Sequence, residues 1–296
     1  MNTVARATAA DVTVVIPTLG GPLLSGCVES IARGTVWPAR VVVVDQSGSS
    51  AAPEWMARLR IQGMDIAHVL ATPAGISAAT NLGLRQARTR FVAVTHDDCL
   101  VRSDWLERMA AGLAGIGEAI LTGRVEPAGD GIVLTVKTDP LPATFTRPQL
   151  TGDVLFPPNM GFALGVLDRV GWFDEHPSLA TAGEDNEWAH RALRRGVAIN
   201  YDPTIVVDHL ARHGPADLPG LYRRYARGHG AFYGTWLRRA DLLIAVRAGR
   251  DLLRAPWLLV RGLLTRNREL VSMGRGELTG LLPGILQGLR NRGVRP

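Results

Sequence analysis

The chain of 296 residues has 33 basic and 27 acidic side chains, a formal net charge of +6, and a hydrophobic fraction of 46%. This length and composition suit one large or two modest globular domains and exclude disordered and fibrous proteins. Two cysteines, Cys27 and Cys99, are too few for a disulfide scaffold or a cysteine zinc site. A reduced, cytoplasmic setting is therefore expected.

Neither export nor a membrane span is expected. The apolar run at residues 12–16 is too short for the core of a signal peptide. Arginines interrupt the longest apolar stretch, at residues 242–264, whereas a spanning helix needs about 20 nearly uncharged residues.

The first third of the chain predicts a doubly wound α/β sheet. Three short β-branched runs, at residues 12–16, 40–44 and 91–95, lack polar alternation and are typical of strands buried on both faces. Between them lie amphipathic stretches long enough for crossover helices, at residues 23–33, 52–62 and 78–88. This βαβαβ order is that of a sheet with helices on both sides.

The middle of the chain predicts an interrupted continuation of the sheet. Short strands are expected at residues 120–125 and 132–136. The Pro-rich stretch at 140–158 is expected to be a long loop that forms a lid or an acceptor wall.

A further helix is expected from near Gly183 to Gly196, where glycine ends it. Two more strands are expected at residues 197–201 and 204–207, and the second runs into His209.

Polar residues gather where the first three strands end. Pro17 and Thr18 follow the first strand, Asp45 the second, and Asp97 and Asp98 the third. Ligands of open α/β sheets bind outside the carboxyl ends of the strands, so the site is expected there.

Each of the polar residues in these motifs can have a functional role or a purely structural one. A carboxylate at Asp45 can accept a hydrogen bond from N3–H of uracil or thymine, or can simply begin a turn. Adjacent carboxylates at Asp97 and Asp98 favour Mg²⁺ or Mn²⁺, with helix capping as the alternative. For Glu184 and Asp185 the structural alternative is that they are acidic side chains stabilised by the dipole at a helix N-terminus. For His209 the structural alternative is a histidine of the core.

Taken in order, these blocks resemble the family 2 glycosyltransferases of GT-A fold over about residues 11–210. The blocks are VVIPT, VVVVDQSGSS, PAGISAATNLG, VTHDDC, NMGFALG with GWFDE, GEDNEW and VVDHL. Each block alone is a weak signal, and their shared order is a strong one.

The resemblance implies an inverting transfer of a hexosyl or deoxyhexosyl group from a nucleoside diphosphate sugar, with UDP or dTDP favoured, to an acceptor hydroxyl, lipid-linked or in a cell-envelope glycan. Asp185 is the implied general base, and Mg²⁺ or Mn²⁺ the implied cofactor. The donor residues implied are Pro17, Thr18, Asp45, Gly75, Asn81, Asp97 and Asp98. Those implied for the acceptor or sugar pocket are Asn159, Met160, Glu184 and Trp188. The metal ligands implied are Asp97, Asp98 and His209.

The chain departs from the family pattern at three places. His96 replaces the first acid of the metal motif, so either Asp97 shares the ion or the ion is held more loosely. Thr80 replaces an arginine before Asn81, and Ala163 and Leu164 replace arginines after the NM block. The alternatives are a catalytically impaired homologue that binds nucleotide sugars, or a transferase acting on a soluble natural product.

The charge divides the chain into a catalytic domain at 1–210 and a basic helical extension at 211–296. The extension has 16 arginines and five acids, a net of +11. Five arginines recur every seven residues and would share one helix face: Arg247, Arg254, Arg261, Arg268 and Arg275. Pro256 is expected to kink or end a helix.

The extension is expected to attach the protein to the inner face of the plasma membrane, with its arginines on lipid phosphates. The alternative is that its apolar face packs on the catalytic domain or joins two copies in a homodimer. Nucleic acid is not an expected partner, because it would leave the acidic strand ends unexplained.

Overall fold

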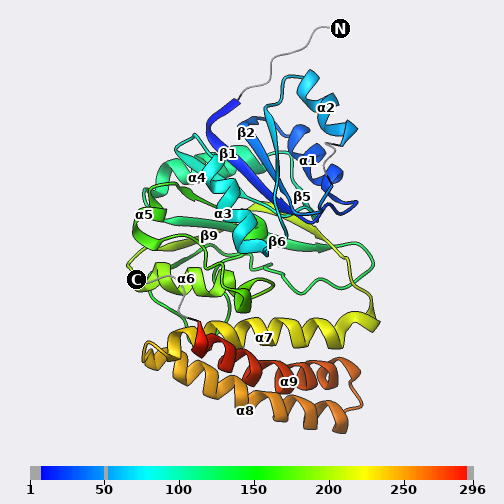
Figure 1. Cartoon of the computed structure of the whole chain (residues 1–296), viewed down its shortest axis with the longest axis vertical. Helices are drawn as coiled ribbons and strands as arrows, with labels where there is room; N and C mark the ends of the chain where they lie inside the picture. The colour runs from blue at the N-terminus through cyan, green and yellow to red at the C-terminus, as the bar shows by residue number, and fades with distance from the viewer. Residues whose placement is uncertain (1–7, 50–52, 292–296) are drawn as a thin grey trace.

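The computed structural model describes residues 8–49 and 53–291 (Figure 1). Expectations about the first seven residues, the helix start at residue 52 and the last five residues fall outside these ranges. Within them, one mixed sheet has the strand order β3-β2-β1-β4-β8-β6-β9-β5, and β7 pairs with β9. The α/β class predicted from the sequence is confirmed.

The strands are β1 (Thr8–Thr18), β2 (Trp37–Asp45), β3 (Ile66–Leu70), β4 (Phe91–Val94), β5 (Cys99–Val101), β6 (Ile120–Ala128), β7 (Ala143–Phe145), β8 (Met160–Ala163) and β9 (Ile199–Leu210). The α-helices are α1 (Leu24–Ala32), α2 (Glu54–Ile61), α3 (Ile76–Gln86), α4 (Trp105–Ile116), α5 (Val166–Val170), α6 (Glu184–Arg194), α7 (Leu218–Leu237), α8 (Leu242–Leu264) and α9 (Arg268–Arg290). Short 3₁₀ helices occupy Pro157–Asn159, Pro177–Leu179 and Pro215–Asp217.

The parallel half of the sheet, β3-β2-β1-β4, is buried on both faces as predicted. In β1, Val14 and Ile16 belong to one hydrophobic cluster, and Val15 belongs to the cluster on the opposite face. Since helices cover both faces, polar groups of this region collect at the carboxyl ends of the strands, where the connections to the helices begin.

Two sequence expectations about strands are wrong. Residues 132–136 form no strand, because only Ile132 pairs, in an isolated bridge with His213. The strands expected at 197–201 and 204–207 are one strand, β9, whose register against β6 shifts around Pro203. Proline cannot donate to the ladder, and such a bulge lets the strand continue.

The three long C-terminal helices form a layer below the sheet, with α7 next to the sheet body (Figure 1). Pro256 does not end a helix, so this part of the expectation is wrong: α8 continues through Pro256 to Leu264. Among the described residues, no helix is both long and apolar enough to cross a membrane.

Glycines let α7 and α9 approach backbone to backbone. The glycines of α9 that face α7 recur every four residues, at Gly276, Gly280, Gly284 and Gly288. A Cβ added at Gly284 would lie 2.1 Å from the Arg227 carbonyl oxygen, so only glycine fits there.

The shared face predicted for the heptad arginines is wrong. Arg247 is buried and pairs with Asp153 at 3.0 Å, and Arg254 pairs with Glu277 of α9. Arg268 and Arg275 lie on α9 rather than on α8. The heptad spacing crosses a helix boundary and therefore does not produce one arginine face.

We predict that Gly284→Ala destabilises the fold by about 1–3 kcal/mol, because the added methyl group overpacks the α7–α9 contact. The matched control is Gly249→Ala in α8, where an added Cβ would meet no atom within 4 Å. The control should stabilise the protein by up to about 1 kcal/mol through helix propensity. Urea unfolding followed by circular dichroism measures the free energy of unfolding of both variants. Equal stabilisation by the two changes would contradict the close contact between α7 and α9.

Candidate functional site

A cavity of about 1020 Å³ opens at the carboxyl ends of the central strands. Its walls include the ends of β1, β4 and β9, the start of α6, residues 153–158, and residues of α7, α8 and α9. The predicted site residues that line it are Pro17, Thr18, Gly75, Asp97, Asp98, Glu184, Asp185 and His209. The cavity therefore lies at the strand ends, where the sequence predicts the site, and the roles of these residues stay predictions.

Asp97 is held from two sides at the floor of this cavity. The Thr18 hydroxyl donates to Asp97 Oδ2 at 2.5 Å, and Arg212 donates to Asp97 Oδ1. Arg212 Nε also lies 2.9 Å from Asp98 Oδ2. One guanidinium thus partly neutralises both adjacent carboxylates, which would otherwise repel each other.

Asp98 faces His209 across 3.2 Å, from Oδ2 to Nε2. Burial alone would raise the pKa of Asp98, but the hydrogen bond and charge of His209, with the nearby His96 and Arg212, hold it well below its usual range. Burial would lower the pKa of His209, yet Asp98 raises it above its ordinary value. Asp98 is therefore ionised at neutral pH.

The residues here fit a hard divalent cation. Ligand atoms of Asp98, Cys99 and His209 lie within 4.8 Å of one another. His209 Nδ1 is 3.1 Å from the Thr135 carbonyl oxygen, which can only accept, so Nε2 is the nitrogen left for a metal. Burial raises the pKa of Cys99 well above its ordinary value, so its thiol stays protonated and a carboxylate–imidazole pair remains.

His96, in place of the family's first acid, also lines the cavity. Burial lowers the pKa of His96, which favours the neutral imidazole over the imidazolium. Among the described residues, its buried Nε2 has no hydrogen-bond partner. A buried imidazole thus stands at the position where the family pattern has a carboxylate.

Glu184 and Asp185 open α6 after Gly183, whose φ of 86° is left-handed and suits glycine. Burial, followed by the charge of Asp185, raises the pKa of Glu184 well above its usual value. Burial, followed by the charge of Asp153, raises the pKa of Asp185. A carboxylate with a raised pKa is a stronger base, which suits proton transfer.

The backbone and side-chain amides of Asn186 donate to Asp185 Oδ1 at 2.7 and 3.1 Å. The other oxygen of this carboxylate is therefore the one left to take a proton. Asp153 and His229 also line the cavity near Asp185, and His229 lies 4.0 Å from Asp153.

Asp45 lies beside the cavity with its carboxylate already engaged. Its Oδ1 accepts from the Ser47 N–H at 2.8 Å, and its Oδ2 lies 2.9 Å from His68 Nε2. The first contact is that of the turn which the sequence offered as the alternative. Nucleobase binding by Asp45 stays a prediction.

Asn81 is buried in α3 and fastens the segment after α5. Its amide donates to the Phe173 carbonyl and to Glu175, and its side-chain oxygen accepts from the Phe173 N–H. Neighbouring Thr80 is buried as well. These contacts hold the segment after α5 against α3.

Three residues predicted for the acceptor or sugar pocket also lie in the core. Asn159 accepts from the Trp105 indole and donates to the carbonyls of Arg124 and Ile205. Met160 and Trp188 are buried, and the Trp188 ring stacks on Phe173. Ala163 and Leu164, where the family has arginines, are half-buried. In this structure these side chains shape the site without lining its cavity.

Sequence reasoning missed the cavity residues beyond β9. They include Arg212, His213, Arg224, Tyr225 and His229, and Asp153, which lies before β9, was missed as well. Arg212 follows the His209 block by three residues, and this proximity was the signal available. The α7 residues carry no signal of their own, because only packing brings that helix over the cavity.

The sequence model of the family described as "Glycosyl transferase family 2" matches residues 13–167. The chain is 26% identical over 212 residues to glycosyltransferase AglE of Haloferax volcanii, covering 68% of this chain and 67% of that protein. It is 28% identical over 291 residues to the pre-mycofactocin glycosyltransferase of Mycobacterium tuberculosis, covering 95% of this chain. The chain spans only 57% of the length of that mycobacterial relative.

Two solved structures share the fold. Mannosyltransferase PcManGT from Pyrobaculum calidifontis, in complex with GDP-Man and Mn²⁺, aligns with a TM-score of 0.62 and 15% identity over 97% of this chain and 88% of that one. S. aureus TarS 1–349, in complex with UDP-GlcNAc, aligns with a TM-score of 0.56 and 15% identity over 90% of both chains. The GT-A fold predicted from the sequence is confirmed.

We predict that Arg212→Gln increases the affinity for Mn²⁺ alone, because Arg212 and a divalent ion compete for the same carboxylates. The matched control is Arg102→Gln, which removes an equal charge from an exposed arginine paired with Asp208 at 3.3 Å. Calorimetric titration with Mn²⁺ measures both. Equal changes in the two variants would show a general charge effect and contradict competition at Asp97 and Asp98.

Proposed function

This chain belongs to glycosyl transferase family 2, and we propose that it transfers a sugar from a nucleoside diphosphate sugar to an acceptor hydroxyl, with inversion at the anomeric carbon. One observation carries the proposal. The Asp98–His209 pair and Asp185 line the same cavity, so a place for a metal-bound diphosphate and a base of raised pKa share one space.

The proposed donor is a UDP- or dTDP-sugar. Asp45 at the carboxyl end of β2 is the residue that favours a pyrimidine. Structures of this fold contain UDP-GlcNAc in TarS and GDP-Man with Mn²⁺ in PcManGT, which supports a nucleotide sugar as the class of donor. The transferred group proposed is a hexosyl or deoxyhexosyl group.

Asp185 is proposed to act as the general base. It takes the acceptor hydroxyl proton while that oxygen forms a bond to the anomeric carbon. The bond from this carbon to the diphosphate oxygen breaks at the same time, and the leaving nucleoside diphosphate keeps the electron pair. Attack opposite the leaving group inverts the anomeric configuration.

A Mg²⁺ or Mn²⁺ ion bound by Asp98 and His209, with Asp97 beside them, would neutralise charge on the leaving diphosphate. Arg212 already contacts both acids and contributes a permanent positive charge at the same place. Thr18 orients Asp97 through its hydroxyl. These residues support departure of the nucleotide and leave proton transfer to Asp185.

The second candidate is a binding protein without turnover, which His96 favours because it replaces the first acid of the metal motif. The two functions differ in whether nucleoside diphosphate is released. We propose a lipid-linked or cell-envelope acceptor for the enzyme, with a soluble natural product as the alternative.

We predict that the protein with Mn²⁺ slowly releases nucleoside diphosphate from UDP-sugars even without acceptor, since water can replace the acceptor hydroxyl. Asp185→Asn should lower this turnover by about 10²–10⁴-fold, with donor affinity nearly unchanged, because a base acts in the transition state. Glu184→Gln should have a milder effect. Coupled detection of UDP with calorimetry of donor binding measures both quantities.

Donor binding without release by the wild type would favour the binding protein. If Asp185→Asn instead loses donor affinity and keeps its turnover per bound donor, Asp185 belongs to donor binding.

We also predict a pH effect of Asp153. A base works only when deprotonated, so turnover should fall as the pH drops through the raised pKa of Asp185. Because the negative charge of Asp153 raises that pKa, Asp153→Asn should move the acidic limb of the kcat profile to lower pH. Asp168→Asn, at an exposed position of α5, is the control and should leave the limb in place. An acidic limb unmoved by Asp153→Asn would contradict the assignment of Asp185.

A further inference from the structure

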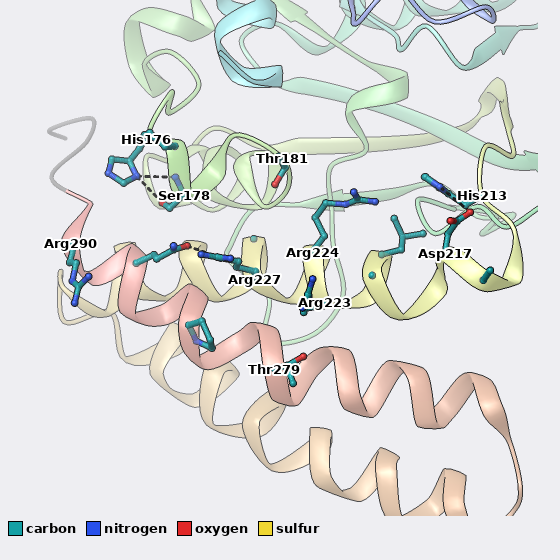
Figure 2. A pocket seen from close by; sticks show the side chains of 17 residues that line it. His176, Ser178, Thr181, His213, Asp217, Arg223, Arg224, Arg227, Thr279 and Arg290 are labelled. Atoms are coloured by element: carbon teal, nitrogen blue, oxygen red, sulfur yellow. Dashed lines mark hydrogen bonds and ion pairs between the residues drawn. The ribbon is translucent and has the colours of Figure 1, made fainter. Parts of the chain in front are cut away.

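A second cavity, of about 1060 Å³, lies between α7, α9 and the segment at residues 176–181 (Figure 2). Its lining residues include four arginines, namely Arg223, Arg224 and Arg227 from α7 and Arg290 from α9. Among these lining residues the acidic one is Asp217. Arg224 and His213 line both this groove and the cavity at the strand ends, so the two spaces adjoin along α7.

Most of this positive charge is not neutralised by the protein. Across residues 8–49 and 53–291, no carboxylate lies within ion-pair distance of Arg223, Arg224 or Arg290. Arg227 donates to the neutral Gln287 at 3.0 Å (Figure 2). By contrast, Arg247 and Arg254 have acidic partners. Unpaired guanidinium groups around a concavity are suited to phosphate oxygens.

An exposed apolar row borders this groove on α9. The groove is lined by Thr279, Pro283, Gln287 and Arg290. Each is preceded by an exposed leucine, namely Leu278, Leu282, Leu286 and Leu289. Adjacent helix positions lie about 100° apart, so the leucine row runs along the groove edge on the outer side of the helix.

Exposed apolar residues also lie on α8, the outermost helix of the layer (Figure 1). Its exposed apolar residues include six that share one helix face, namely Leu242, Val246, Leu253, Trp257, Val260 and Leu264, and Leu252 and Leu263 are exposed as well. Leu253 and Leu264 have 76% and 80% of their surface exposed. Exposed apolar side chains gathered on helix faces in this way are typical of an interaction site.

We propose that the groove between α7 and α9 binds the phosphate of an anionic membrane lipid, whose acyl chains lie over the exposed leucines of α9 and α8. The juxtaposition of unpaired arginines with an apolar row matches an amphiphile with a phosphate head. Trp257 on the same face suits the boundary between headgroups and chains. A water-soluble anion would use the arginines and leave the leucine rows unexplained.

Flotation with vesicles tests this proposal without needing catalysis. The full chain should float with vesicles rich in phosphatidylglycerol and not with vesicles of phosphatidylcholine alone. Arg223→Gln/Arg290→Gln should weaken binding roughly 30-fold, since each basic residue near an anionic leaflet contributes about fivefold. Leu282→Ser/Leu286→Ser should also weaken it, and both pairs are exposed, so the fold should persist.

The matched control is Arg58→Gln/Arg88→Gln, which removes the same charge from exposed positions at α2 and after α3. It should bind almost as the wild type does. If both arginine pairs weaken vesicle binding equally, the attraction depends on net charge alone, and binding of lipid phosphate in the groove would be contradicted. Equal binding to neutral vesicles would also overturn it. Absence of flotation at low salt, with elution as a dimer, would assign the apolar face to a second copy.

Discussion

The concentration of carboxylates in one cavity is the constraint on which this site depends. Asp97, Asp98, Asp153, Glu184 and Asp185 all line it. Like charges held this close destabilise one another unless cations or protons intervene. The chain meets this constraint in two ways, one at the strand ends and one at the start of α6.

At the strand ends, cationic groups keep the acids ionised. Arg212 bonds Asp97 and Asp98, and His209 faces Asp98, whose pKa falls as a result. At the start of α6, burial and neighbouring acids raise the pKa of Glu184 and Asp185. One end of the cavity therefore suits a cation with a diphosphate, and the other suits a proton. Carboxylates in opposed environments are the usual arrangement for assigning such roles.

The C-terminal layer takes part in this arrangement. A Cβ added at Gly183, directly before α6, would lie 2.4 Å from the Gly228 carbonyl oxygen of α7, so the two backbones are in close contact. Arg247 of α8 reaches Asp153 in the cavity wall, and His190 of α6 contacts Asp241 before α8. The helices that carry the apolar outer face thus also fix the position of α6, which begins with Glu184 and Asp185.

The sequence predicted those features that follow from local composition. Runs such as residues 40–44 specify buried strands, and polar residues after them specify the strand-end site. Features set by long-range packing were not predictable. The amide of Asn159 satisfies three buried groups far apart in the chain, which its motif does not reveal. Arg247 belongs to the same seven-residue repeat as exposed arginines, yet it is buried and pairs with Asp153.

The most direct test of the account is calorimetric titration of UDP with and without Mn²⁺. If the diphosphate and the ion meet at Asp98, Mn²⁺ should tighten UDP binding, and UDP should tighten Mn²⁺ binding by the same factor. Asp98→Asn should abolish this coupling. UDP binding of equal affinity in EDTA and in Mn²⁺, or coupling that survives Asp98→Asn, would contradict the account.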